Sequence, residues 1–426
     1  MIRPETEMKD SGIEYVGAIP KDWDLVRLRA YFGERKNKNK DGNETNLLSL
    51  SYGRIIRKNI DKTDGLLPAS FNTYNIVEKN DIIIRPTDLQ NDKRSLRTGL
   101  VTEHGIITSA YIDLMPIGNV DSRFVHYLLH SYDILKVFYN MGSGVRQGLN
   151  YSEFSKLKVP MPPLSEQQAI ADYLDETCFK IDEIIAEAKA SIDEYKELKQ
   201  SVIDKAVLHG LCNGMMKDSG NDLIGKIPLS WEMRKLKYVA DFNPGITTAY
   251  DAQKEVGYVP MNCVKNGYMN PLSARLSDMS TGLTGFQDGD IVIAKVTPCF
   301  ENGNIAVAEN LEQGVAFGSS ELFVIRTHSI NRRFMLYYLQ NSVFKNQCIS
   351  TMTGTGGLKR VSGYFVNNAY ITYPPENEQQ VIVNYLDEAV KNMDSLIAEK
   401  QSLIADLEAY KKSLIYEVVT GKRRVV

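Results

Sequence analysis

Two glycine-rich segments carry side chains that can form hydrogen bonds with nucleic acid. GSGVRQGLN spans 142–150 and includes Arg146 and Gln147, while GTGGLKRVS spans 354–362 and includes Lys359 and Arg360. Glycine lets a backbone approach a phosphate closely, and an Arg or Gln beside it can read the edge of guanine or adenine. One such segment is usually an ordinary turn, but its recurrence at a matching place in the chain favours a binding role.

Further candidate contacts follow two matching β-type runs, DIIIR at 81–85 and DIVIA at 290–294. The first leads into RPTDLQNDKRSLRTG (85–99) and the second into TPCFENGN (297–304). Cations suit phosphates and guanine, and asparagine suits adenine, although each cation can be a solvated surface charge and each asparagine can close a turn. The candidate DNA-binding residues are Arg85, Lys93, Arg94, Arg97, Arg146, Gln147, Lys295, Asn302, Asn304, Lys359 and Arg360.

The elements that position these residues occur twice. KDSGIEYVGAIPKDW (9–23) matches KDSGNDLIGKIPLSW (217–231) at an offset of 208, and both tryptophans of the chain fall at this position. PPLSEQQAIADYLDE, from 162, matches PPENEQQVIVNYLDE, from 374, at 10 of 15 positions. Internal similarity at a fixed period indicates a repeated architecture. The chain is therefore two copies of one unit of about 210 residues.

Each copy ends in a long predicted helix with a coiled-coil pattern. Ser165 with Gln168, and Asn377 with Gln380, fit a capping box at the two helix starts. Acidic residues outnumber basic ones in both segments. Heptad faces left over after mutual packing suit partner helices, although they can also be solvated charged faces. The candidate partner-binding residues are Ile181, Ile185, Ile192, Met393, Ile397 and Ile404.

The pattern predicts an α/β fold class: two bodies of mixed α/β fold, joined by two long antiparallel coiled-coil helices, with a pseudo-two-fold internal repeat. The expected boundaries are 1–160 and 211–372 for the bodies, and 161–210 and 373–426 for the helices. Two dissimilar bodies at a fixed separation suit a two-part, asymmetric DNA target. A fused homodimer with a structural helical stalk is the alternative.

The sequence lacks the motifs of several enzyme classes. No phosphate-binding G-x-x-x-x-G-K-[ST] motif occurs, no Gly-x-Gly cofactor motif follows a strand, and neither Pro-Pro pair fits an adenine-methylation motif. His126 and His130 are four residues apart but lack the glutamate of a metalloprotease helix. Glu34 and Lys36 have a nuclease-like spacing that does not recur in the second copy. We expect no catalytic residue, no metal site and no cofactor on this chain.

Composition favours a cytoplasmic protein. The chain has 50 Lys and Arg against 53 Asp and Glu, for a net charge of −3. Its five cysteines form no C-x-x-C pair, which is typical of free thiols in a reducing compartment. No apolar stretch is long enough to span a membrane, and the N-terminal residues do not resemble a signal peptide.

The chain resembles the specificity subunit of type I restriction–modification enzymes over nearly its whole length. The most specific segments are GAIPKDW, GKIPLSW, PPLSEQQ, PPENEQQ and TPCFENGN. The resemblance implies that each body is a DNA target-recognition domain and that the helices are a spacer. It also implies partners: double-stranded DNA, two methyltransferase subunits and up to two restriction subunits, with S-adenosylmethionine and ATP/Mg bound only by those subunits. A scaffold that docks methyltransferase subunits without reading DNA remains the alternative.

Overall fold

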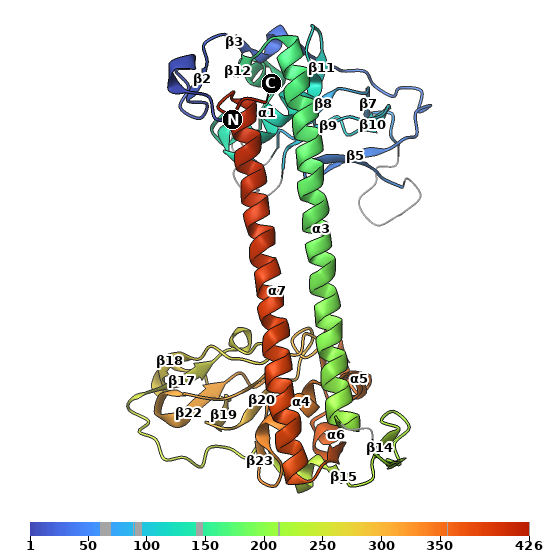
Figure 1. The fold of residues 1–426 in the computed structure, drawn as a ribbon, viewed down its shortest axis with the longest axis vertical. Coiled ribbons are helices and arrows are strands. Elements are labelled where there is room, and N and C mark those ends of the chain that lie inside the picture. The colour runs from blue at the N-terminus through green and yellow to red at the C-terminus, as the bar shows by residue number, and fades with distance from the viewer. Residues whose placement is uncertain are drawn as a thin grey trace. The chain divides into compact units, whose positions relative to one another are not determined.

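The chain folds into two compact units that each contain parts of both long helices (Figure 1). A computed structural model describes residues 1–59, 70–87, 89, 96–141, 148–211, 214–355 and 357–425. Unit 1 comprises Met1–Lys189 with Gln401–Val426, and unit 2 comprises Ala190–Lys400. The long helices are α3 (Leu164–His209) and α7 (Glu376–Val419). The unit boundaries therefore fall inside the helices, whereas the sequence pattern placed each helix outside the bodies.

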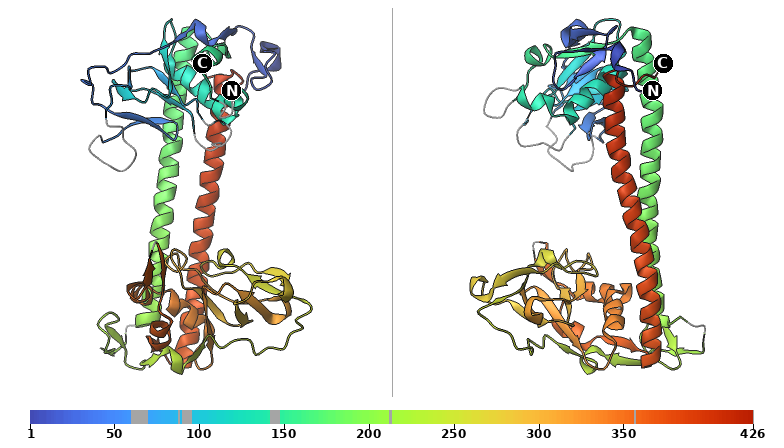
Figure 2. Two further views of the ribbon diagram at one scale, coloured as in Figure 1. Left: turned by 180° about the vertical axis from the view of Figure 1, so that it is seen from behind. Right: turned by 60° about the vertical axis from the view of Figure 1, so that its left-hand side comes forward.

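Each unit is built on a four-stranded antiparallel sheet with the same order of equivalent strands. In unit 1 the order is β4 (Phe32–Glu34), β11 (Ile112–Pro116), β8 (Ile82–Ile84) and β9 (Thr98–Leu100). In unit 2 it is β16 (Ala240–Phe242), β23 (Leu322–Thr327), β20 (Ile291–Ala294) and β21 (Ile305–Val307). Figure 2 shows from two sides that, within each unit, the strands lie beside the helix segments. The predicted mixed α/β fold class is confirmed.

The units differ in the strands around this common sheet. Unit 2 has a second sheet of β18 (Leu272–Arg275), β17 (Glu255–Val259), β22 (Val315–Gly318) and β19 (Thr284–Gln287), in which β17 and β22 are parallel. The described part of unit 1 instead has the ribbons β5 (Leu48–Ser51) with β6 (Arg54–Arg57), and β7 (Asn75–Val77) with β10 (Gly105–Ile107).

Strand pairs of three further kinds form separate two-stranded sheets. The first two occur in both units: β1 (Met8–Asp10) with β2 (Ala18–Pro20) matches β13 (Met216–Asp218) with β14 (Lys226–Pro228), and β3 (Asp24–Arg27) with β12 (Lys158–Met161) matches β15 (Glu232–Lys235) with β26 (Tyr370–Tyr373). The third, the hairpin of β24 (Thr353–Thr355) and β25 (Leu358–Arg360), is in unit 2.

The strands β8 and β20, which precede the candidate DNA-contact loops, begin in the same way. Asp81 accepts a hydrogen bond from the Glu78 N–H over 2.8 Å and pairs with Arg35. Asp290 accepts one from the Gln287 N–H over 2.9 Å and pairs with Arg326. Both carboxylates are buried, so the paired arginines and N–H donors compensate their lost hydration.

The sequence pattern predicts one helix near the end of each body, over Arg123–Tyr139 and Arg333–Cys348, and the observed helices differ from it. In unit 1, α1 (Ser122–Ile134) ends before Lys136, which has a left-handed φ of 63°. In unit 2, Asn341 divides the predicted helix into α4 (Arg332–Gln340) and α5 (Ser342–Ser350). Asn341 has an extended backbone, and its side chain accepts a hydrogen bond from the Phe344 N–H, so it begins a new helix. The short helices α2 (Tyr151–Phe154) and α6 (Gly363–Asn368) precede β12 and β26.

The repeated tryptophans and glutamates tie each entry segment to a long helix. The buried Trp23 indole donates to Glu166 over 3.0 Å, and Arg3 forms an ion pair with the same carboxylate. In unit 2 the buried Trp231 indole donates to Glu378 over 2.7 Å. These contacts explain why the two segments are duplicated together, because each needs the other.

The starts of α3 and α7 are held by a glutamine that the capping-box prediction did not include. Gln167 donates to the Pro162 carbonyl and accepts from the Asp121 N–H. Gln379 donates to the Pro374 carbonyl and accepts from the Asn331 N–H. Both glutamines are about 2% exposed. The predicted capping box is wrong, because both helices begin one residue before its proposed N-cap.

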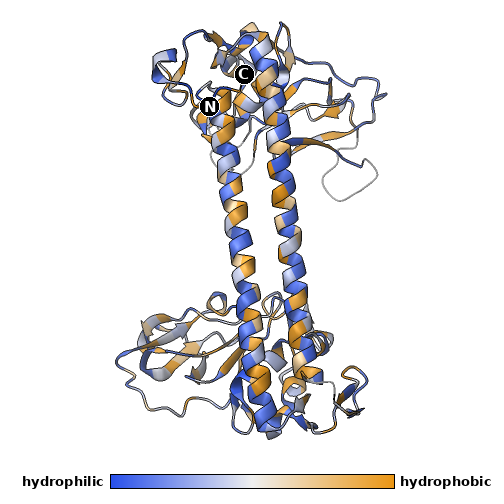
Figure 3. Cartoon of the chain, viewed as in Figure 1, coloured by the Kyte–Doolittle hydropathy of each residue, from blue (hydrophilic) through white to orange (hydrophobic). Residues whose placement is uncertain are grey.

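Within each unit, segments of α3 and α7 pack side by side in opposite directions. In unit 2, Thr372, just before α7, donates to the Val207 carbonyl near the end of α3, while Lys199 pairs with Asp394 further from both ends. In unit 1, Lys411 of α7 pairs with Asp182 of α3. Figure 3 shows apolar and polar residues alternating along both helices. Each unit has its own main apolar core, which includes residues of both helices.

Candidate nucleic-acid interface

The loop that follows β20 is the centre of the candidate interface in unit 2. The Thr297 N–H donates to the Lys359 carbonyl over 2.9 Å, and the Val361 N–H donates to the Lys295 carbonyl over 2.9 Å. The first half of the loop therefore pairs with β25. The segments TPCFENGN and GTGGLKRVS, which sequence analysis selected separately, are neighbours in space.

Gly354 allows the β24–β25 hairpin to form. Its φ is 141°, and a Cβ atom at this position would lie 2.2 Å from the Leu358 carbonyl oxygen. No other residue type fits so close to the opposite strand. One glycine of this segment therefore has a structural role, and the hairpin exposes Lys359 and Arg360.

Three cations lie in or beside the hairpin, Lys295, Lys359 and Arg360, and they differ in their partners. Arg360 makes two hydrogen bonds of 2.9 Å with Glu321, and this contact lowers the pKa of the Glu321 carboxyl. The Lys295 amine lies 5.4 Å from the centre of the Phe323 ring. Lys359 is exposed and forms no ion pair with any described residue. Of the three, Arg360 is the one already bound to a carboxylate within its unit.

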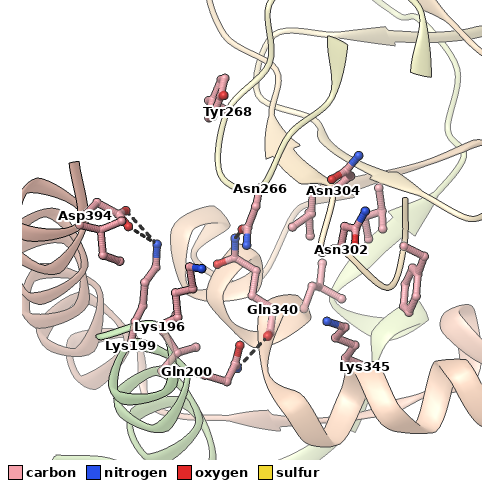
Figure 4. A pocket seen from close by; sticks show the side chains of 17 residues that line it. Lys196, Lys199, Gln200, Asn266, Tyr268, Asn302, Asn304, Gln340, Lys345 and Asp394 are labelled. Atoms are coloured by element: carbon pink, nitrogen blue, oxygen red, sulfur yellow. Dashed lines mark hydrogen bonds and ion pairs between the residues drawn. The ribbon is translucent and has the colours of Figure 1, made fainter. Parts of the chain in front are cut away.

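Asn302 and Asn304, at the end of the same loop, line a pocket of about 600 Å³ in unit 2 (Figure 4). Both side-chain amides are without a hydrogen-bond partner among the described residues. The remaining polar lining comes from α3, α4, α5, α7 and the loop before β18: Lys196, Lys199, Gln200, Asn266, Tyr268, Gln340, Lys345 and Asp394. Apolar side chains, including Phe300, Ile293 and Ile305, complete the walls.

The three lysines of this pocket have different surroundings. Lys199 is held by both oxygens of Asp394, over 2.7 and 2.8 Å. Lys196 pairs with Asp193 one turn earlier on α3. Lys345 is half-buried and forms no ion pair or side-chain hydrogen bond within the described chain. The pocket therefore has one unbalanced half-buried cation.

Sequence analysis did not identify these lysines, Asn266 or Gln340. Lys196 and Lys199 belong to the charged flank of a coiled-coil pattern, and Lys345 lies in a short helix without a motif. Only the packing of α3, α5 and the loop after β20 around one pocket distinguishes them.

In unit 1 the structure describes only part of the predicted site. Lys93, Arg94, Arg146 and Gln147 lie outside the described residues. Arg85 is half-buried at the end of β8.

Arg97 was predicted to contact DNA, and the structure corrects this. Its side chain is 0% exposed, and its guanidinium donates to the carbonyl of Thr87 over 2.6 Å and to the hydroxyl of Tyr139 over 3.3 Å. Arg97 therefore holds the Thr87 carbonyl inside the unit, and a side chain with no exposed surface cannot reach DNA.

Unit 1 has a pocket of about 550 Å³ at the equivalent place, between α1, α3 and α7. Arg54 and Lys411 both bind Asp182 there, over 2.9 and 2.6 Å. Arg123 binds Asp172 and Asp175. The cations of this pocket are thus balanced by acids to a greater extent than those of unit 2.

Two histidines lie at the base of the unit 1 pocket. Burial lowers the pKa of His126 to about 3 and that of His130 to about 4. His126 Nε2 and His130 Nδ1 are buried without a hydrogen-bond partner among the described residues. In the described part of the chain, no group of three or more His, Cys, Asp or Glu side chains is arranged to hold a metal ion. Among the same residues, no helix is long and apolar enough to cross a bilayer.

A model of the type I restriction–modification DNA specificity domain matches the chain twice, over residues 20–194 and 228–405. The chain belongs to this family. The two matches coincide with the two copies of the sequence repeat.

Curated relatives of this family are similar to parts or all of the chain. The specificity subunit of the type I restriction enzyme EcoAI from Escherichia coli is 35% identical over 192 residues, which are 44% of this chain and 32% of that subunit. The chain thus matches about a third of the length of this relative. The MjaVIII specificity subunit from Methanocaldococcus jannaschii is 23% identical over 96% of this chain and 94% of its own length.

Solved structures of this family have the same fold. One of these structures describes the complex assembly and conformational transition of the type I R-M system. A chain of that structure superposes on this chain with a TM-score of 0.71 and 16% identity, over 95% of this chain and 99% of that chain. The HsdS subunit from Thermoanaerobacter tengcongensis superposes with a TM-score of 0.52 and 16% identity, over 95% of this chain and 98% of its own.

The helix residues predicted to bind partners differ in burial. Ile181, Ile185 and Ile192 are 5–8% exposed, because they pack inside the chain. Met393, Ile397 and Ile404 are half-buried. The exposed apolar residues that recur every seven positions on α7 are instead Leu396, Leu403 and Tyr410, and α3 exposes Ile184 and Leu198.

Proposed function

We propose that this chain is the sequence-specific DNA-binding specificity subunit of a type I restriction–modification complex. It reads a bipartite, asymmetric target with a fixed gap, catalyses no reaction itself, and acts in the cytoplasm, where the DNA is. The observation that carries the proposal is a repeated framework with different loops. The strands β8 and β20 begin alike at Asp81 and Asp290, but RPTDLQNDKRSLRTG follows one strand and TPCFENGN the other.

Different loops on one framework suit two different half-sites, because base edges are read by side chains while phosphate contacts set position. In unit 2, Asn302 and Asn304 supply amides that suit adenine, and the exposed Lys359 and Arg360 suit guanine or phosphate. The DNA is double-stranded, because an intact duplex presents base edges in its grooves.

The partners in this proposal are two methyltransferase subunits and up to two restriction subunits. Exposed Leu396, Leu403 and Tyr410 of α7 support helix docking, since apolar side chains at heptad spacing pack against another helix. The methyltransferase and restriction subunits bind S-adenosylmethionine, ATP and Mg²⁺ in this scheme, and this chain binds none of them.

The test is to co-express the chain with a type I methyltransferase subunit and to map methylated adenines across the host genome by single-molecule sequencing. The proposal predicts a two-part motif with a fixed gap. A stable complex that produces no motif would instead identify a docking scaffold. Failure of the two proteins to form a complex would favour a fused dimer with a structural stalk.

A further inference from the structure

The unit 2 pocket holds a half-buried cation without a counter-ion. Lys345 of α5 lines the pocket and pairs with no described acid, whereas Lys199 is neutralised by Asp394. A partly desolvated charge without a partner is unfavourable, so an anion in the pocket would stabilise it.

A second cation on the same pocket can be exchanged between partners. Lys196 of α3 is 59% exposed and pairs with the exposed Asp193 over 3.0 Å. Surface ion pairs at this spacing are weak and screened by salt. Figure 4 shows that Lys196 and Lys345 lie on the same pocket, and they come from different helices. An anionic group in the pocket can therefore bind both lysines, and among the described residues the only contact it has to displace is the weak Lys196–Asp193 ion pair.

The amides on the neighbouring wall indicate which anion fits. Asn302 and Asn304 have side-chain amides without partners among the described residues. A strand of DNA needs cations for its phosphates beside hydrogen-bonding groups for its base edges. A free inorganic anion would use the lysines and the amide N–H donors but leave the amide oxygens unused, whereas a base edge that carries both a donor and an acceptor uses both.

We propose that Lys196 and Lys345 bind backbone phosphates of the DNA strand whose bases face Asn302 and Asn304. The long helix α3 is then part of the DNA-binding surface of unit 2, in addition to being a spacer. This inference rests on the proposed function and concerns the same site. Lys196 and Lys345 then contribute to the affinity for DNA, while Asn302 and Asn304 of the loop after β20 select the base sequence.

The experiment measures DNA binding by the full-length chain at several salt concentrations. A fluorescent duplex carrying the mapped target is titrated with wild type, Lys196→Gln, Lys345→Gln and the double variant. Each lost phosphate contact reduces the slope of log K against log salt by about 0.9. We therefore expect a reduction of about 0.9 in each single variant and about twice that in the double variant, with an unchanged methylation motif.

The controls separate charge from folding and this inference from the proposed function. Lys205→Gln, an exposed lysine of α3 outside the pocket, retains the wild-type slope, and Lys345→Arg restores it. Wild-type slopes in both pocket variants would overturn the phosphate contacts while leaving DNA recognition intact. Absence of salt-dependent DNA binding by the wild type would overturn the proposed function itself. Lys345-dependent binding of ATP without DNA, with an unchanged DNA slope, would assign the pocket to a free nucleotide instead.

Discussion

Two half-buried histidines of α1 affect how unit 1 responds to acid. His126 and His130 lie one helical turn apart with ring centres separated by 6.1 Å. Burial lowers both pKa values, to about 3 and about 4, so the folded state keeps both rings neutral above these values. A histidine in an unfolded chain has a pKa near 6.5. Between about pH 4 and pH 6.5, these two rings therefore bind protons in the unfolded state but not in the folded state.

Acid should therefore destabilise the protein through these residues. The contribution of the two neutral rings to the free energy of unfolding is fully present above about pH 6.5 and is lost as the pH falls towards 4. Between pH 7 and pH 5 each histidine should reduce the free energy of unfolding by about 2 kcal/mol. Calorimetry of His126→Gln should show a smaller loss over this interval than wild type. A matched change at the exposed His328 should leave the loss unaltered.

Lys359 provides a residue-scale test of half-site reading. Because it is exposed on the β24–β25 hairpin of unit 2, Lys359→Ala should weaken or relax one half of the methylation motif by about 1–3 kcal/mol per contacted base pair. Mapping of methylated adenines across the genome reports both halves of the motif in one measurement. Lys254→Ala, at an exposed lysine distant in sequence, is the control. Equal weakening on all sequences would mean that Lys359 contacts only phosphate.

At the scale of elements, sequence patterns predicted what repeats and missed what depends on packing. The heptads predicted α3 and α7, and the matched β-type runs predicted β8 and β20. The break at Asn341 was missed, because an asparagine is tolerated inside a helix pattern and its capping role depends on local backbone geometry. Gln167 was missed because its partners, Pro162 and Asp121, belong to different elements.

The candidate site was predictable to the extent that it is local in sequence. Lys295, Asn302, Lys359 and Arg360 were selected from loop composition, and the structure brings their loops together. Lys345 carried no local signal, since it is distinguished only by lining the same pocket as Asn302. Arg97 was misassigned because the sequence does not show that its guanidinium donates hydrogen bonds to Tyr139 and Thr87. These partners become visible only in the fold.

The glutamine at the start of α7 should be important for stability. Gln379→Leu removes the partners of the Asn331 N–H and the Pro374 carbonyl, so we expect a loss of about 2–3 kcal/mol in the free energy of unfolding. Urea denaturation of the variant measures it. Gln380→Leu, at the exposed neighbouring position, should cost less than about 0.5 kcal/mol. Equal losses in the two variants would contradict the assigned role.

At the scale of the whole molecule, each unit keeps one framework and changes its loops. The contacts Trp23–Glu166 and Trp231–Glu378 recur in both units, as does the strand order of the central sheet. In contrast, the second sheet of unit 2 has only separate ribbons as its counterpart in the described part of unit 1. Under the proposed function, stability and target choice thus depend on different residues.

The long helices supply a test of this division. Removing residues 187–193 and 400–406 together takes one heptad from each helix and preserves the register of the Asp182–Lys411 and Lys199–Asp394 pairs. Seven residues of helix correspond to about 10 Å, or about three base-pair steps. Methylome mapping should return the same two half-site sequences with a shorter gap. Methylation at the original gap would refute a spacer role for α3 and α7.

Under the proposed function, the Arg360–Glu321 contact makes DNA binding by one edge of Arg360 an exchange of hydrogen-bond partners. The Nε and Nη2 donors of the guanidinium already have a bidentate acceptor 2.9 Å away, so a DNA group that binds this edge of Arg360 must replace the carboxylate. An acceptor that offers two aligned oxygens or nitrogens can complete the exchange, and one that offers a single acceptor cannot match what is given up. In that proposal Glu321 is an internal competitor, so a DNA group with two aligned acceptors is favoured over one with a single acceptor at this edge of Arg360.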